Sequence, residues 1–145
     1  MHTDDLGIAK KRLRDGDLTL SVVKDGKTIF ETSLHGISGF LEAVEKNGKK
    51  LESASAADRV VGKAVALLCL YVKMRAIYAV TLSKKAEALL KENNVYVEWQ
   101  ELVDRILNKD KSDMCPFEKI ASDLTEPKEA YAKFVGLKNS LNDKR

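Results

Sequence analysis

The chain has 145 residues, of which 25 are basic and 22 acidic, and 44% are hydrophobic. This length is sufficient for one globular domain with a core of its own. Charges of both signs alternate along the chain, so the composition does not indicate a surface that binds nucleic acid. The sequence is therefore that of an ordinary folded domain.

Three further observations concern the cellular location of the protein. Cys69 and Cys115 are far apart and match neither a disulfide framework nor a zinc-ribbon spacing, which suits a reducing environment. The first residues do not have the pattern of a secretory signal. The longest apolar run, residues 60–72, contains Lys63 and is too short to span a bilayer. We therefore expect a cytoplasmic protein without membrane contact.

The first third of the chain predicts a helix, a hairpin and a second helix. Apolar residues among basic ones favour an N-terminal helix that ends at Asp15-Gly16-Asp17, within residues 1–17. Alternation over residues 18–23 and a return over 28–32 predict a hairpin with its turn at Asp25-Gly26. Residues 38–46 have helical spacing and end at Asn47-Gly48.

The middle of the chain predicts a buried central helix and a strand–helix–strand unit. Residues 49–57 are small and polar, which favours a loop or a short irregular strand. Residues 58–74 are apolar nearly all round and predict a helix between other elements. Residues 76–82 and 95–98 predict parallel strands around a helix over 84–92 that Ser83 caps.

The last third predicts short helices. Residues 99–107 favour a short helix, 108–113 a polar loop, and Cys115-Pro116 opens a helix that reaches about residue 122. Residues 127–141 place apolar side chains on one stripe of a helix. That stripe either packs on the core of its own chain or forms a homodimer contact.

Familiar catalytic sites are missing from the sequence. His2, His35 and two separate cysteines do not supply the ligand set of a zinc site, and no nucleophile is paired with His35. Gly62-Lys63 does not belong to a phosphate-binding loop, because Ala57 and Ala64 stand where that motif requires Gly and Ser or Thr. We expect neither a metal nor another cofactor.

The start of the predicted central helix is the first candidate site. Asp58 is the expected N-cap, and Arg59 and Lys63 lie four residues apart, so that both could contact one anion at the positive end of the helix dipole. Gly62 inside a helix suggests that a ligand or another backbone comes close. The alternative is structural: both cations reach solvent, and Gly62 lets a strand pack tightly.

The second candidate site lies around Cys115. If Pro116 is the first helical residue, Cys115 is the N-cap, and its thiol lies at the positive end of the dipole, where thiolates are stabilised. Glu118 would then fold back onto the cap and place a carboxylate near the thiol. The alternative is that Cys115 fills a small apolar gap and Glu118 only caps the helix.

Two motifs resemble those of an uncharacterised family of small prokaryotic proteins whose fold is grouped with the cytidine deaminases. They are D-R-V-V-G-K-A at residues 58–64 and D-M-C-P-F-E-K at 113–119, and the resemblance covers about residues 18–120. It implies an α/β, cytidine-deaminase-like three-layer sandwich, with a mixed sheet between helices on both faces. The single domain, residues 1–145, would comprise a core over 18–124 and a C-terminal helix and charged tail over 125–145.

The resemblance also implies where zinc chemistry would lie in a deaminase. Deaminases of this fold carry H-x-E or C-x-E at the start of the central helix and P-C-x-x-C at the next helix start. The comparable positions here read Val61-Gly62-Lys63 and residues 83–87, S-K-K-A-E. A lysine stands in the place of the glutamate and the zinc ligands are missing, so the resemblance implies a pocket and not deaminase activity.

We therefore expect a metal-free deaminase-like domain that binds a small anionic or nucleotide-like ligand. Lys63 and Cys115 are the candidate catalytic residues. The predicted ligand-binding residues are Asp58, Arg59, Gly62, Lys63, Ser83, Asp113, Cys115 and Glu118. The alternative is a non-catalytic regulatory or protein-interaction domain that uses the fold as a scaffold.

Overall fold

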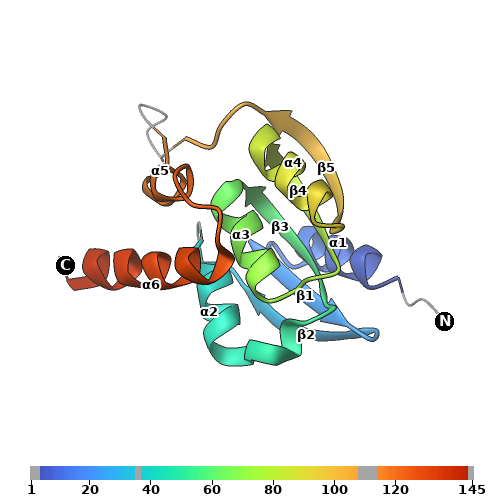
Figure 1. Ribbon diagram of the computed structural model, residues 1–145. Helices are drawn as coiled ribbons and strands as arrows, with labels where there is room; N and C mark the ends of the chain where they lie inside the picture. Colours follow the sequence, from blue (N-terminus) through green and yellow to red (C-terminus); the bar gives the residue numbers. More distant parts are fainter. Residues whose placement is uncertain (1–3, 35–36, 108–113, 144–145) are drawn as a thin grey trace.

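A computed structural model describes residues 4–34, 37–107 and 114–143. It is built on a five-stranded mixed sheet in the order β2-β1-β3-β4-β5 (Figure 1). The strands are β1 (Leu20–Lys24), β2 (Lys27–Thr32), β3 (Ser55–Val61), β4 (Ala76–Ser83) and β5 (Tyr96–Val103). The helices are α1 (Asp5–Asp15), α2 (Ser38–Asn47), the 3-10 helix η1 (Gly48–Leu51), α3 (Lys63–Tyr71), α4 (Lys84–Glu92), α5 (Pro116–Ala121) and α6 (Pro127–Asp143).

The N-terminal hairpin and both helices beside it confirm the sequence prediction. Asp25 and Gly26 have φ values of 52° and 79°, as expected at the centre of a tight hairpin turn. β1 pairs antiparallel with β2 on one side and with β3 on the other. Asp4 caps α1, since its carboxylate accepts a hydrogen bond from the backbone N–H of Gly7 at 3.0 Å.

The parallel pairing predicted for the strands on either side of α4 is also confirmed. β3 pairs parallel with β4, and β4 pairs parallel with β5, so the carboxyl ends of all three strands meet at one edge of the sheet. α3 and α4 are the connections between these strands. The functional consequence is that both helices start at this same edge.

One face of the sheet carries the main core. Buried side chains of α2, α3, α4 and α6 pack there against apolar residues of the strands, and α3 is buried along most of its length. Tyr131 of α6 stacks on Tyr71 of α3 with ring centroids 4.6 Å apart, and Phe134 makes an edge contact with Phe117. The predicted stripe of α6 thus packs on its own core, while a homodimer contact stays a prediction.

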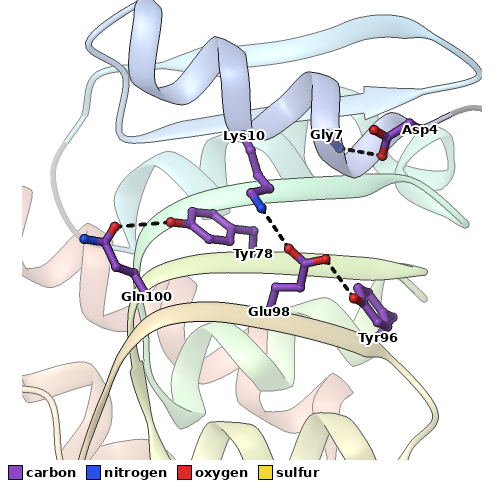
Figure 2. A network of polar contacts seen from close by, with 7 residues as sticks. All are labelled: Asp4, Gly7, Lys10, Tyr78, Tyr96, Glu98 and Gln100. Carbon is purple, nitrogen blue, oxygen red and sulfur yellow. Dashed lines mark hydrogen bonds and ion pairs between the residues drawn. The ribbon is translucent and has the colours of Figure 1, made fainter.

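The other face is covered by α1. Ala9 and Leu13 pack there on Val23 and Ala57. Figure 2 shows Lys10 pointing from α1 to the sheet, where its ammonium lies 2.9 Å from the Glu98 carboxylate and 4.8 Å from the centre of the Tyr78 ring. Helices therefore cover both faces, and the α/β mixed sheet expected from the sequence is confirmed.

The boundary of the central helix was predicted wrongly. Residues 58–61 belong to β3, and α3 begins only at Lys63. β3 lies between β1 and β4 and is buried on both faces for most of its length, so it carries no alternating pattern. A buried strand that runs directly into a buried helix forms one apolar run, which periodicity alone cannot divide.

The helix predicted over residues 99–107 is also wrong. β5 continues to Val103, which pairs with Ser83 at the end of β4. Leu102, Val103 and Ile106 have helical spacing by coincidence, and the pairing with β4 decides the backbone conformation. The polar loop predicted over 108–113 lies outside the described residues.

Candidate functional site

A small pocket lies at the carboxyl ends of the parallel strands. Its volume is about 260 Å³, and it lies between the starts of α3 and α4, the segment after β5, and α5. It is lined by Lys63, Ser83, Lys85, Asp104, Arg105, Met114, Glu118 and Ser122. The pocket thus joins the two motifs that the sequence singled out, at Asp58–Ala64 and Asp113–Lys119, which start 55 positions apart (113 minus 58).

The start of α3 is capped by a side chain from a distant part of the chain. The two carboxylate oxygens of Glu118 accept hydrogen bonds from the backbone N–H groups of Lys63, at 3.1 Å, and Ala64, at 2.7 Å. These amides belong to the unpaired N–H groups at a helix start, which attract negative charge. A carboxylate of α5 therefore holds the place that a bound anion would take.

Gly62 makes room for this contact. A Cβ atom built on Gly62 would lie 2.5 Å from the carboxyl group of Glu118. The backbone at Gly62 has φ −105° and ψ −172°, an extended conformation that other residues adopt readily. The glycine is thus explained by the close approach of Glu118 and not by backbone geometry.

Glu118 is a buried carboxylate, with 9% of its surface exposed. Burial raises its pKa above the ordinary value, whereas the N–H groups of Ala64 and Lys63 and the positive charges of Lys63 and Lys85 act in the opposite direction. The sequence predicted that Glu118 would fold back on its own helix near the Cys115 thiol. The carboxylate instead caps α3, and Cys115 has no side-chain cap bond.

Three cationic side chains line the pocket. Lys63 extends from α3, and its ammonium lies 3.4 Å from the carbonyl oxygen of Ser122. Lys85 in the first turn of α4 and Arg105 after β5 have exposed side chains, and neither makes an ion pair within residues 4–34, 37–107 and 114–143. With Asp104 and Glu118 as the lining carboxylates, the cations exceed the anions by one (three minus two).

Ser83 and Asp104 organise the α4 side of the pocket. The Ser83 hydroxyl accepts a hydrogen bond from the N–H of Ala86 at 3.2 Å, which confirms it as the N-cap of α4. The Asp104 carboxylate lies 2.9 Å from the Lys84 ammonium, and this contact lowers the pKa of Asp104. Asp104 is thus already neutralised in part by a cation outside the pocket lining.

Arg59 does not share a helix face with Lys63, since it lies in β3. Its guanidinium donates from Nε to the Leu18 carbonyl at 2.7 Å, and from the terminal nitrogen to the Leu13 carbonyl at 3.3 Å, near the end of α1. Leu13 belongs to the helix on the opposite face of the sheet. Arg59 thus ties α1 to β3, and it is not among the residues that line the pocket.

Asp58 is not an N-cap either. Its side chain lies within the sheet, only 7% exposed, and one carboxylate oxygen accepts from the N–H of Val60 at 3.3 Å. Burial raises the pKa of Asp58 to about 7, and the backbone N–H groups of Val60 and Arg59 offset only part of that effect. Asp58 is therefore a buried acid of the strand, outside the pocket lining.

Cys115 takes the predicted position but has no contact with the pocket that the structure records. It is the N-cap residue of α5, and Pro116 is the first helical residue, as expected. Its neighbour Met114 lines the pocket, whereas Cys115 does not. Catalytic roles for Lys63 and Cys115 stay predictions, and Asp113 lies outside the described residues.

Sequence reasoning missed Lys85, Asp104, Arg105, Met114 and Ser122 as lining residues. The helix predicted over residues 99–107 hid the carboxyl end of β5, where Asp104 and Arg105 follow the strand. Had that segment been assigned as a strand parallel to β4, the position of both residues at the pocket edge would have followed.

A larger hollow of about 540 Å³ lies at the opposite edge of the sheet, beside α1. Its charged residues already serve the fold. Asp5 accepts from the backbone N–H groups of the hairpin turn, at Asp25 and Gly26, and Glu98 holds both Lys10 and the Tyr96 hydroxyl (Figure 2). Asp5, Lys10 and Glu98 at this hollow are thus engaged in contacts within the fold.

Within residues 4–34, 37–107 and 114–143, no three His, Cys, Asp or Glu side chains come together in a group that could hold a metal ion. No helix in the same part is both long enough and apolar enough to cross a membrane.

Comparisons with known proteins identify the family. Residues 8–136 match the family model described as TM1506, a domain of unknown function (DUF1893). The crystal structure of a DUF1893 family protein, TM1506 from Thermotoga maritima, superposes with a TM-score of 0.84 at 30% sequence identity, over 94% of this chain and 91% of that chain. A search of curated proteins finds no match. The chain therefore belongs to the DUF1893 family, a domain whose function is unknown.

Proposed function

We propose that the pocket between α3, α4 and α5 binds a small molecule through an oxyanion, a phosphate or a carboxylate. The observation that carries this proposal is the presence of Lys63, Lys85 and Arg105 around one pocket at the carboxyl ends of parallel strands. Ligands of open α/β sheets bind at this edge, and helix starts there favour anions. Lys85 and Arg105 make no ion pair within 4.0 Å among residues 4–34, 37–107 and 114–143, and both side chains are exposed.

The volume of the pocket restricts the ligand. Pockets that enclose drug-sized molecules measure about 300–1,000 Å³. At about 260 Å³ this pocket suits a phosphate or carboxylate with a small attached group, and the remainder of a nucleotide would extend into solvent. A sugar phosphate or the phosphate end of a nucleotide fits this description.

The resemblance to the cytidine-deaminase fold supports the same place for a ligand. The sheet, ordered β2-β1-β3-β4-β5, has the starts of α3 and α4 at one edge, where the resemblance implies a pocket. The described side chains of the pocket do not suit the zinc of a deaminase, because they include three cations. The carboxylates among them, Asp104 and Glu118, are engaged with Lys84 and the α3 amides. We therefore propose a metal-free site and derive no deamination step.

A thermal-shift screen of nucleotides and sugar phosphates tests the proposal. Binding to the native state raises the midpoint of unfolding with ligand concentration. The account expects a concentration-dependent rise that Lys63→Ala and Lys85→Ala reduce and Lys49→Ala, at an exposed position on η1, leaves unchanged. If no anion raises the midpoint, or if all three variants respond alike, a non-catalytic scaffold that binds other proteins becomes the better account.

A further inference from the structure

We propose that Glu118 is an internal competitor for the ligand of this pocket, so that an incoming oxyanion displaces its carboxylate from the amides of Lys63 and Ala64. This inference rests on the function proposed above. It adds a regulatory contact within the chain and names the atoms that the ligand would contact.

The first argument is the geometry of the present contact. Each oxygen of the Glu118 carboxylate accepts one backbone N–H group, at 3.1 Å and 2.7 Å, and the same residue lines the pocket. A carboxylate or a phosphoryl group carries two oxygens at a similar separation. A ligand with either group can therefore place one oxygen on each N–H group, as Glu118 does, whereas chloride would have to accept both bonds on one atom.

The second argument is the space that the chain keeps for this carboxylate. Gly62 adopts an ordinary extended backbone, and yet any Cβ atom there would overlap Glu118. The absence of a side chain at this position creates a recess for an oxyanion beside the helix start. The recess is filled by the protein's own acid.

The third argument is the charge around the recess. Lys63 and Lys85 lie close enough to stabilise the negative charge of Glu118, and Arg105 lines the same pocket. An incoming anion would meet the same cations, but it would also meet the repulsion of the Glu118 charge while that side chain remains in place. Displacement of Glu118 removes the repulsion and frees both amides.

The fourth argument is the element that carries Glu118. α5 has six residues and is followed by Ser122, whose carbonyl oxygen lies 3.4 Å from the Lys63 ammonium. Glu118 is the third residue of α5, so rotation of this one side chain would release both α3 amides. Met114 and Ser122 on either side of α5 line the pocket, so its outline would change at the same time.

Calorimetric titration with inorganic phosphate and with acetate tests the competition, with chloride at equal ionic strength as the reference. The account expects Glu118→Gln to bind phosphate about tenfold more tightly than the parent protein, an equivalent of about 1.4 kcal/mol. Asp104→Asn is the matched control, because it removes a carboxylate of the same pocket that does not contact the α3 amides. A much smaller gain is expected for this control.

The outcomes separate the two proposals. If neither the parent protein nor Glu118→Gln binds phosphate or acetate, the proposed function itself fails. If the parent protein binds phosphate and Glu118→Gln binds it no more tightly than Asp104→Asn does, Glu118 is a structural cap and the competition is wrong. A gain in affinity for chloride as large as that for phosphate would also overturn it.

A measurement on the parent protein covers the case in which Glu118→Gln does not fold. The carboxyl carbon resonance of Glu118 reports the hydrogen bonds of its oxygens. The account expects this resonance to move toward that of a solvated carboxylate as phosphate saturates the protein. A resonance that stays in place while phosphate binds would show that the ligand does not displace Glu118.

Discussion

Gly62 and Glu118 fit together because the carboxyl group of Glu118 occupies the space that a side chain at position 62 would require. The two residues are 56 positions apart (118 minus 62), and they meet where β3 ends and α3 begins. This contact joins α5 to the central helix and brings one residue of each motif together. Glu118 also lines the pocket in which we propose that an oxyanion binds.

The first prediction tests this fit by Gly62→Ala. The added Cβ atom overlaps a carboxyl group at 2.5 Å, so Glu118 must withdraw from the α3 amides. The expected cost is about 1–3 kcal/mol of unfolding free energy. Urea unfolding at pH 7 measures it.

The Glu118→Ala background is the control for that prediction. Without the carboxylate, an alanine at position 62 meets no clash, and its extended conformation is allowed. Gly62→Ala should then be neutral or stabilising by about 0.4–1 kcal/mol, since it restricts the unfolded chain. An equal loss of stability in both backgrounds would contradict the fit described here.

The second prediction concerns the buried acid of β3. Asp58→Asn removes a negative charge from a side chain that is 7% exposed, and an oxygen remains to accept from the N–H of Val60. The change of pKa from 3.8 to about 7 corresponds to about 4 kcal/mol of lost stability at alkaline pH. We expect Asp58→Asn to recover part of this lost unfolding free energy at pH 8.

The pH dependence of that effect has a definite sign. The folded state binds the Asp58 proton more tightly than the unfolded state, so the stability of the parent protein falls as the pH rises from about 4 to about 7. The advantage of Asp58→Asn should therefore vanish below pH 4 and be constant above about pH 8. Thermal unfolding of both proteins across this range measures it, and a pH-independent difference would be inconsistent with a buried ionisable carboxylate.

The third prediction separates Arg59 from Lys63. Arg59 donates to the Leu18 and Leu13 carbonyls and is absent from the pocket lining. Arg59→Ala should reduce the unfolding free energy by about 1–3 kcal/mol, since charged hydrogen bonds are lost, and should leave phosphate affinity unchanged. Lys63→Ala should weaken phosphate binding and should reduce the unfolding free energy by less than about 0.5 kcal/mol.

Paired unfolding and phosphate-binding measurements on the two variants check this prediction. A marked loss of phosphate affinity in Arg59→Ala would restore that residue to the binding site. A large loss of stability in Lys63→Ala without any change in affinity would mean that its contact with Ser122 is structural.

The sequence predicted the elements with strong local signals. Asp25-Gly26 marked the hairpin turn, Ser83 marked the start of α4, and Cys115-Pro116 marked the start of α5, because each depends on the chemistry of a few adjacent residues. All three positions agree with the structure. The parallel pairing of the strands on either side of α4 followed from the helix predicted between them.

The division between β3 and α3 did not follow from the sequence, because the apolar end of β3 continues directly into the apolar α3, and Asp58 and Arg59 within the strand had the pattern of a helix start. The extension of β5 to Val103 depends on its pairing with β4, a contact between segments that are distant along the chain. The capping of α3 by Glu118 likewise depends on a contact between segments that are distant along the chain. An unexplained glycine at position 62 was the only local signal, and a single sequence cannot say which residue fills the space beside it.

An amide-resolved NMR titration of the parent protein with inorganic phosphate tests the central claim most directly. The account predicts saturable shifts concentrated at the amides of Lys63, Ala64, Lys85 and Arg105, which surround the pocket. Little change is expected at Lys10 and Glu98, on the opposite face of the sheet. Shifts that do not saturate, or that are spread evenly over the lysines of the surface, would contradict an oxyanion site in this pocket.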